Sequence, residues 1–221
     1  MDQALIISIL PHHRDRFKII TAERLYVRDY KHYDLTIAAE DNRGVVIESN
    51  PDPEWDSVTL FNQKPGELFV VFDSFPENAL PEDEVGKYAS QCECVLFPAD
   101  GNENDWLLFI ETKYTQSEET AHSPAVNYPG KMFSQIRSTV DYFRRKGILP
   151  LEQKVYAIMS FPKLLEPFDS WAFPVAVEDQ ENGQVDYLTI IDILTKYRIH
   201  IRSTNQAHII SPKRIKLGTI G

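Results

Sequence analysis

The stretch 93–113 reads Glu-Cys-Val-Leu-Phe-Pro-Ala-Asp-Gly-Asn-Glu-Asn-Asp-Trp-Leu-Leu-Phe-Ile-Glu-Thr-Lys, which is two apolar runs separated by a polar, turn-like segment. This pattern predicts a β-hairpin. A turn centred near Asn102 sets Glu93 directly opposite Glu111. Because side chains alternate between the two faces of a strand, Lys113 shares a face with Glu111, and Glu93 lies on that face too.

Two carboxylates that lie directly opposite each other destabilise a hairpin unless a cation lies between them. Glu93 and Glu111 therefore indicate a metal site. Their oxygen atoms suit Mg²⁺, which binds one or two protein carboxylates and completes its shell with water and phosphate. Lys113 adds an ammonium group that would orient a water molecule or stabilise charge in a transition state. A Glu-x-Lys sequence alone is common and fits an ordinary exposed strand end, but its place after an apolar strand and opposite a second acid favours a functional interpretation.

The sequences Glu-Cys-Val-Leu-Phe at 93–97 and Leu-Leu-Phe-Ile-Glu-Thr-Lys at 107–113 resemble the core motif of the PD-(D/E)XK nuclease superfamily. The resemblance implies a restriction-endonuclease-like fold and metal-dependent cleavage of DNA, with RNA as a further substrate. It implies that Glu93 and Glu111 bind Mg²⁺ or Mn²⁺ and that Lys113 is the catalytic lysine. A nuclease that cuts both strands of a duplex would be expected to pair two sites in a homodimer.

The clearest helix of the chain is predicted over Lys131–Lys146, after Pro129-Gly130 and before Gly147. A buried strand is predicted next, over Lys154–Phe161, from its run of apolar residues. The superfamily core likewise places a helix and then a strand after the hairpin. These two elements therefore extend the resemblance downstream of the motif.

Polar side chains on this helix are further candidates for the site. Some members of the superfamily carry a Gln and a Tyr there, and Gln135 and Tyr142 lie two turns apart on one face. The resemblance implies a catalytic role for Gln135 and nucleic-acid contacts for Tyr142, Arg137, Arg144 and Arg145. The ordinary interpretation is an exposed polar position for Gln135 and a core or boundary aromatic for Tyr142.

The sequence also departs from the superfamily pattern. The first metal ligand is usually Asp, whereas Glu93 stands here and no Pro precedes it. Members often carry a helical acid and a further strand ahead of the hairpin. Early acids and apolar spacing predict a short helix over Pro81–Ser90, with Glu84 as the candidate helical acid and other acids, Glu77 and Glu82, as alternatives. The further strand would be Glu67–Phe72 or lie upstream of it.

We expect an α/β (α+β) fold in which helices flank a mixed central β-sheet. Residues 1–75 would form a β-rich N-terminal region continuous with the core sheet, and residues 76–221 the nuclease-like core. The N-terminal strands are predicted at Leu5–Leu10, Arg24–Arg28, Asp34–Ala39, Gly44–Glu48, Ser57–Phe61 and Glu67–Phe72. The remaining predictions are an exposed loop at Thr115–Tyr128, strands at Trp171–Val177 and Arg198–Arg202, and a helix at Tyr187–Leu194.

Charge is unevenly distributed along the 221 residues, whose net charge is −10. Residues 40–120 hold 19 acidic and 4 basic side chains, a local net charge of −15 that opposes broad attraction of nucleic acid. From Leu194 to the end there are six basic residues and no acidic one. This basic tail is either a solvated edge or a strip that contacts phosphate groups.

The cysteine usage and the ends of the chain indicate a cellular setting. Cys92 and Cys94 are separated by one residue, a spacing at which neighbours on a strand rarely bridge each other. We therefore expect a reducing, cytoplasmic setting. No run of about 18 apolar residues occurs, so we expect neither a transmembrane helix nor association with a membrane. The start of the sequence shows no basic leader of a signal peptide.

Other functional classes stay open or are disfavoured by the sequence. A nuclease-like module without activity that binds or assembles with a partner would fit the acidic segment 40–120. An interaction protein in which Glu-x-Lys is coincidental is a second alternative. A zinc hydrolase is disfavoured because Cys92 and Cys94 lack a second pair of ligands at suitable spacing. A serine hydrolase is disfavoured because no Gly-x-Ser-x-Gly sequence occurs.

Overall fold

The predicted hairpin forms the centre of a six-stranded mixed sheet in the computed structural model, which describes residues 10, 17–29, 44–50, 56–101, 105–178 and 184–219. The strand order is β1-β5-β6-β7-β8-β11. Neighbours are antiparallel from β1 to β7 and parallel from β7 to β11. The strands are β1 (Phe17–Ile20), β5 (Val70–Ser74), β6 (Cys94–Pro98), β7 (Leu108–Thr112), β8 (Val155–Ser160) and β11 (Ile199–Ser203).

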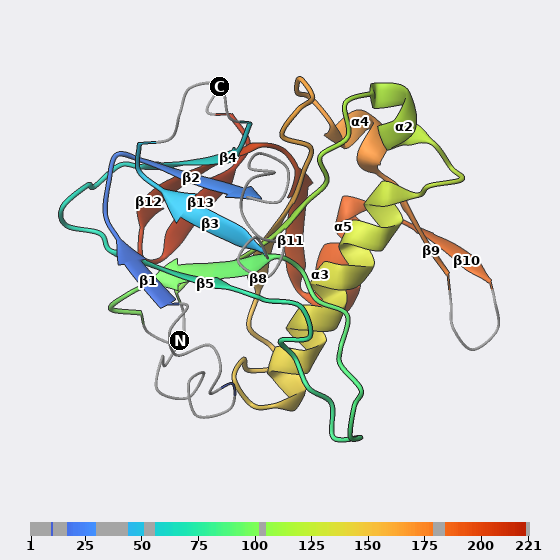
Figure 1. Cartoon of the computed structure of the whole chain (residues 1–221), viewed down its shortest axis with the longest axis horizontal. Helices are drawn as coiled ribbons and strands as arrows, with labels where there is room; N and C mark the ends of the chain where they lie inside the picture. Colours follow the sequence, from blue (N-terminus) through green and yellow to red (C-terminus); the bar gives the residue numbers. More distant parts are fainter. Residues whose placement is uncertain are drawn as a thin grey trace, which may run out of the picture.

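A second sheet of five strands joins the two ends of the chain. Its order is β13-β12-β4-β2-β3, and β12 runs parallel to β4 while the other neighbours are antiparallel. A separate ribbon, β10-β9, projects beside the helices (Figure 1). These strands are β2 (Arg24–Asp29), β3 (Val45–Glu48), β4 (Val58–Asn62), β9 (Val175–Glu178), β10 (Val185–Leu188), β12 (Gln206–Ser211) and β13 (Arg214–Leu217).

The long helix α3 (Tyr128–Arg145) lies along one side of the six-stranded sheet, opposite the five-stranded sheet (Figure 1). Its side chains at Met132, Phe133, Ile136, Val140 and Phe143 are all buried, as their helical spacing predicts. The remaining helices are α2 (Glu118–His122), α4 (Asp169–Ala172) and α5 (Ile190–Tyr197).

Two apolar cores follow from this layering. One lies between α3 and the six-stranded sheet and contains Val95, Phe109 and Ala157 from successive strands. The other lies between the two sheets, and the alternate residues of the same strands, such as Leu96 and Leu108, belong to it. The central strands are therefore buried on both faces, which explains why their sequences are nearly continuous apolar runs.

The mixed α+β fold class expected from the sequence is confirmed, with one difference in the layers. Helices cover one face of the central sheet, and the second sheet covers the other. Strands from the first 75 residues enter both sheets: β1 and β5 pair in the six-stranded one, and β2, β3 and β4 in the five-stranded one. The division of the chain near residue 75 stays a prediction.

The predicted helix over Lys131–Lys146 and strand over Lys154–Phe161 are confirmed as α3 and β8. The helix begins three residues earlier than predicted, because the Asn127 side chain accepts a hydrogen bond from the Gly130 N–H at 3.2 Å and caps it. It ends where Gly147 adopts a φ of 71°. Four of the N-terminal strand predictions overlap β2, β3, β4 and β5, and those at 5–9 and 34–39 lie outside the described residues.

The short helix predicted over Pro81–Ser90 is wrong. Residues 81–88 form a tight loop in which Pro81 and Tyr88 make an isolated antiparallel bridge. Val85, taken as an apolar helix position, is fully exposed, and Gly86 has a φ of 81°. The apolar spacing here has no core to face, so it stabilises no helix.

Three further predictions need correction. The segment Trp171–Val177 begins in the short helix α4 and only its second half is strand, in β9. The helix predicted over Tyr187–Leu194 starts after β10, at Ile190, where Thr189 and Asp192 form a capping box. The polar loop at Thr115–Tyr128 contains α2.

Gly130 gives a test of this arrangement, because α3 approaches the backbone of β9 there. A Cβ atom on Gly130 would lie 2.1 Å from the Ala176 carbonyl oxygen. We expect Gly130→Ala to destabilise the protein by about 2–3 kcal/mol, as overpacking does, measured by chemical denaturation. The exposed neighbour Lys131→Ala is the matched control and should change stability by less than about 0.5 kcal/mol. Equal stability of the two variants would contradict the close approach.

Candidate active site

The hairpin has the register that the sequence predicts. Cys94 pairs with Ile110 and Val95 with Phe109, so the same register sets Glu93, directly before β6, opposite Glu111 near the end of β7. The Glu93 N–H donates to the Ile110 carbonyl at 3.0 Å and holds the end of the hairpin closed. The two acids come from adjacent strands on the face that α3 covers.

Glu111 is a carboxyl group with no exposed surface. Lys113, two residues later on the same face, donates from Nζ to Glu111 Oε1 at 2.5 Å. The other oxygen, Oε2, is buried and has no hydrogen-bond partner among the described residues. Burying a charged group without full compensation is costly. The burial of Oε2 is therefore left uncompensated by the described part of the chain.

The pKa values of Glu111 and Lys113 also reflect the burial of the Glu111 carboxyl group. Burial raises the pKa of Glu111 to about 8, and the nearby charge of Glu93 adds to this, while Lys113 opposes it. Burial alone would lower the pKa of Lys113, but the charges of Glu111 and Glu93 outweigh burial and raise it. Lys113 therefore stays protonated near neutral pH. In the structure it is a hydrogen-bond donor and a positive charge beside Glu111.

The site is open on the side of Glu93 and Lys113. Glu93 is half-buried, and the Lys113 side chain keeps 27% of its surface exposed. The Lys113 N–H donates to the Ser160 carbonyl at 2.9 Å, which fixes the end of β7 against β8. A ligand can thus approach Glu93 and Lys113 at the rigid centre of the sheet, whereas Glu111 itself has no exposed surface.

Gln135 lies beside the chain that leads into Glu93. Its side-chain Nε2 donates to the Gln91 carbonyl at 3.0 Å, and one turn later Thr139 Oγ1 accepts from the Cys92 N–H at 2.9 Å. Two polar groups of α3 thus hold the two residues that precede Glu93. In the structure Gln135 helps to position Glu93, the candidate metal ligand. The catalytic role of Gln135 stays a prediction.

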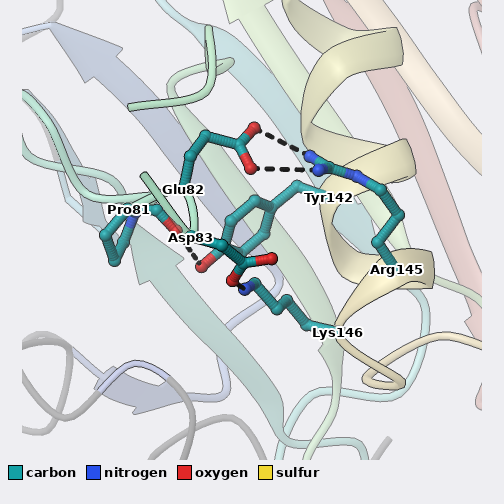
Figure 2. Close-up of polar contacts among 6 residues, drawn as sticks. All are labelled: Pro81, Glu82, Asp83, Tyr142, Arg145 and Lys146. Atoms are coloured by element: carbon teal, nitrogen blue, oxygen red, sulfur yellow. Dashed lines mark hydrogen bonds and ion pairs between the residues drawn. The ribbon is translucent and has the colours of Figure 1, made fainter. Parts of the chain in front are cut away.

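Tyr142 lies away from the acids, further along α3. Figure 2 shows its hydroxyl donating to the Pro81 carbonyl, at 3.0 Å. Arg145 grips Glu82 with two hydrogen bonds of 2.8 and 3.0 Å, and Lys146 pairs with Asp83 at 2.5 Å (Figure 2). Two of the four predicted nucleic-acid contacts, Tyr142 and Arg145, therefore bind the loop 81–88 of the protein itself.

The other predicted contacts are also occupied by the protein itself. Arg144 is nearly buried and donates to the Gln153 carbonyl at 3.3 Å. Arg137 stacks on the Tyr197 ring at 5.4 Å and lies 3.9 Å from Asp141. The candidate helical acid Glu84 is on the exposed loop, where it pairs with Lys87 at 2.7 Å. It is not on a helix, so that part of the prediction is wrong.

The sequence analysis missed two residues near these groups. Tyr128, the first residue of α3, lies close enough to Lys113 to contribute to the raised pKa of that lysine. Asp73 on β5 is fully buried and pairs with Val95, so it shares the sheet face of Glu93. Tyr128 stands directly before the Pro129-Gly130 helix start, which was a usable signal. Asp73 sits in a run of apolar residues and is the one charge in that strand.

Neither a group of metal-ligating side chains among the described residues nor a similar known protein identifies the site. Among the described residues no group of three or more His, Cys, Asp or Glu side chains could hold a metal ion. Comparisons with protein-family models, with curated proteins and with solved structures found no match. In the described part of the chain no helix is long and apolar enough to cross a membrane.

The raised pKa of Glu111 predicts how stability depends on pH. Between about 4.5, the ordinary value, and about 8, the folded protein holds a proton that the unfolded chain has lost, so the free energy of unfolding falls as pH rises. Glu111→Gln removes this titration. We expect its unfolding free energy to exceed that of the wild type by several kcal/mol at pH 8 and by much less at pH 4.5.

Denaturation at both pH values measures this difference. Glu152→Gln, at an exposed carboxylate, is the control that should leave the pH profile of the wild type unchanged. A Glu111→Gln variant with the same pH profile as the wild type would show that Glu111 is not buried as described.

Proposed function

We propose that this protein is a metal-dependent nuclease of the PD-(D/E)XK type, acting on DNA, with RNA as a further substrate. The observation that carries the proposal is the fully buried Glu111. One of its oxygen atoms accepts from Lys113, and the other has no hydrogen-bond partner among the described residues. Buried carboxylates with raised pKa values in an accessible site are typical of functional positions. The strand order supports the proposal, because α3 and then β8 follow the hairpin, and β5 precedes it.

The residues present fit a hard divalent cation. Glu93 and Glu111 would hold Mg²⁺ or Mn²⁺, which takes few protein carboxylates when phosphate and water complete its shell. When bound, the ion would neutralise a phosphate group and lower the pKa of a water molecule. Glu111 Oε2, which has no hydrogen-bond partner in the described part of the chain, is the atom that such an ion would use.

Side chains of the protein would stabilise the developing charge and keep the metal ligands in position. Lys113, protonated and half-enclosed, would donate a hydrogen bond to the attacking water or to the phosphate as negative charge develops. Gln135 and Thr139 would keep Glu93 in place by holding the two residues ahead of it. The rigid pairing of β6, β7 and β8 would keep these groups from moving apart as the reaction proceeds.

The proposal extends to the setting and assembly of the protein. Cys92 and Cys94 are both buried and free, which supports a reducing, cytoplasmic setting. Cleavage of both strands of a duplex would require two sites, so a homodimer belongs to the proposal for duplex DNA. A single-stranded substrate would need one site only.

A second candidate function is a nuclease-like module that binds or assembles without cutting. The pairing of the α3 cations favours it, since Arg145 and Lys146 are bound to Glu82 and Asp83 and not offered to phosphate. The net charge of −10 adds to this, because it opposes attraction of nucleic acid.

Cleavage assays decide between the two functions. Incubation with single-stranded and duplex DNA and with RNA, in Mg²⁺ or Mn²⁺, should give products that disappear when the metal is chelated. We expect Glu111→Gln and Lys113→Ala to lower the rate by at least about 100-fold. Lys18→Ala, at an exposed lysine on the edge strand β1, should keep the wild-type rate. Equal cleavage by wild type and Lys113→Ala would identify a contaminant and reject the catalytic assignment.

Metal binding can be measured without a substrate. Millimolar Mg²⁺ or Mn²⁺ should raise the melting temperature of the wild type, because binding to the folded state alone stabilises it. The shift should vanish in Glu93→Gln and in Glu111→Gln and persist in Glu84→Gln, whose acid lies on the exposed loop. A metal-dependent shift without any cleavage would support the inactive module, and the absence of a shift in the wild type would reject the metal site.

A further inference from the structure

A pocket of about 470 Å³ lies where β7 and β8 begin, at the opposite ends of these strands from Glu111. Its volume is in the range of small-molecule sites. It is lined by side chains from three parts of the chain, the approach to β7, the approach to β8 and the β12–β13 turn: Asp105, Trp106, Pro150, Glu152, Gln153, Lys154, Tyr156 and Lys213.

The walls of this pocket are held together by hydrogen bonds between the sheets. Trp106 Nε1 donates to the Ser211 carbonyl at 2.9 Å, and the Trp106 N–H donates to the Pro212 carbonyl at 3.2 Å. Gln153 Nε2 donates to the Asp105 carbonyl at 3.2 Å and joins the approaches to β7 and β8. The pocket is therefore a fixed feature of the fold, formed before any ligand arrives.

Two lysines at the pocket differ from most of the basic residues described above in having no acidic partner among the described residues. Lys154 and Lys213 are exposed, and neither forms an ion pair within the part of the chain that the structure describes. The exposed acid of the pocket, Glu152, is paired with Arg198 at 3.2 Å. Asp105 is buried and has contacts of its own. The open side of the pocket therefore presents positive charge.

An aromatic ring stands next to these charges. Tyr156 is half-buried, and Lys154 Nζ lies 5.1 Å from the centre of its ring. His200 meets the same ring edge-on at 5.4 Å, and Arg202 follows on the same face of β11. Burial lowers the pKa of His200, and the charges of Lys154 and Arg202 lower it further. Arg202 is paired with Asp169 at 2.6 Å, so Lys154 supplies the positive charge beside the Tyr156 ring.

We propose that this pocket binds a nucleotide unit, with the phosphate at Lys154 and Lys213 and the base against Tyr156. Two ammonium groups that form no ion pair among the described residues match a phosphate, and an aromatic ring beside them matches a planar base of any sequence. The Gln153 amide supplies a polar group for the base or sugar. The ligand is either a free nucleotide or the phosphorylated end of a nucleic acid strand. The proposal does not rest on the metal site, which lies at the other end of β7.

Calorimetric titration of the full chain tests this with three probes: adenosine monophosphate, inorganic phosphate, and a short 5′-phosphorylated oligothymidylate. At least one of the two nucleotide probes should bind, and the double variant Lys154→Gln, Lys213→Gln should weaken that binding by about tenfold or more. Lys216→Gln is the matched control, because it removes an exposed basic charge of the same tail outside the pocket lining. It should change affinity by less than about twofold.

Variants at the ring separate base recognition from phosphate recognition. Tyr156→Leu should weaken nucleotide binding by about fivefold or more and leave binding of inorganic phosphate unchanged, whereas Tyr156→Phe should keep both. Binding of the oligonucleotide but not of the monophosphate would assign the site to strand ends. The proposal is overturned if neither nucleotide probe binds, or if Lys216→Gln weakens binding as much as the double variant. Cleavage and metal-induced stabilisation at Glu111 are measured separately, so the two proposals succeed or fail independently.

Discussion

The constraint on which the molecule depends is a carboxylate buried at the end of its central strand. Glu111 has no contact with solvent, and Lys113 satisfies one of its two oxygen atoms. A core that accepted only apolar side chains at this position would be more stable, since burial of a charge costs free energy that one ion pair does not fully return. The sheet, the helix and the second layer of strands together keep this unfavourable group in place.

The surrounding elements contribute to that task in different ways. Strands β6 and β8 lie on either side of β7 and fix the Glu111 backbone, while α3 fixes the approach to Glu93 through Gln135 and Thr139. The loop 81–88 is tied to the far end of the same helix by two ion pairs and the Tyr142 hydroxyl (Figure 2). The segment that connects β5 to β6, residues 75–93, is thus held against α3. In consequence the helix cations serve the fold, and few positive charges remain for an outside partner.

Local pattern was enough to predict the hairpin, its register and the helix after it. The polar turn centred near Asn102 fixes which residues of the two apolar runs pair, so the opposed acids follow from the sequence. The loop 81–88 could not be predicted this way, because its conformation depends on Arg145 and Lys146, about sixty positions later in the chain. Strands β12 and β13 were missed for a related reason. The partner of β12, β4, comes from a distant part of the sequence, and β13 is a short edge strand that pairs with β12.

The five-stranded sheet has a consequence for how the chain reaches its native state. Thr59 in β4 pairs with Gln206 in β12, so this layer joins the early and late parts of the polypeptide. Contacts between residues far apart in the sequence make folding slow. The chain loses the entropy of closing the long loop before the pairing of the strands contributes any stabilisation. On a ribosome, β2, β3 and β4 would emerge long before β12 is made, and the apolar face they share with the central sheet would be incomplete until then. Strands β12 and β13 therefore complete this layer, and a chain that lacked them would expose the inner face of its own core.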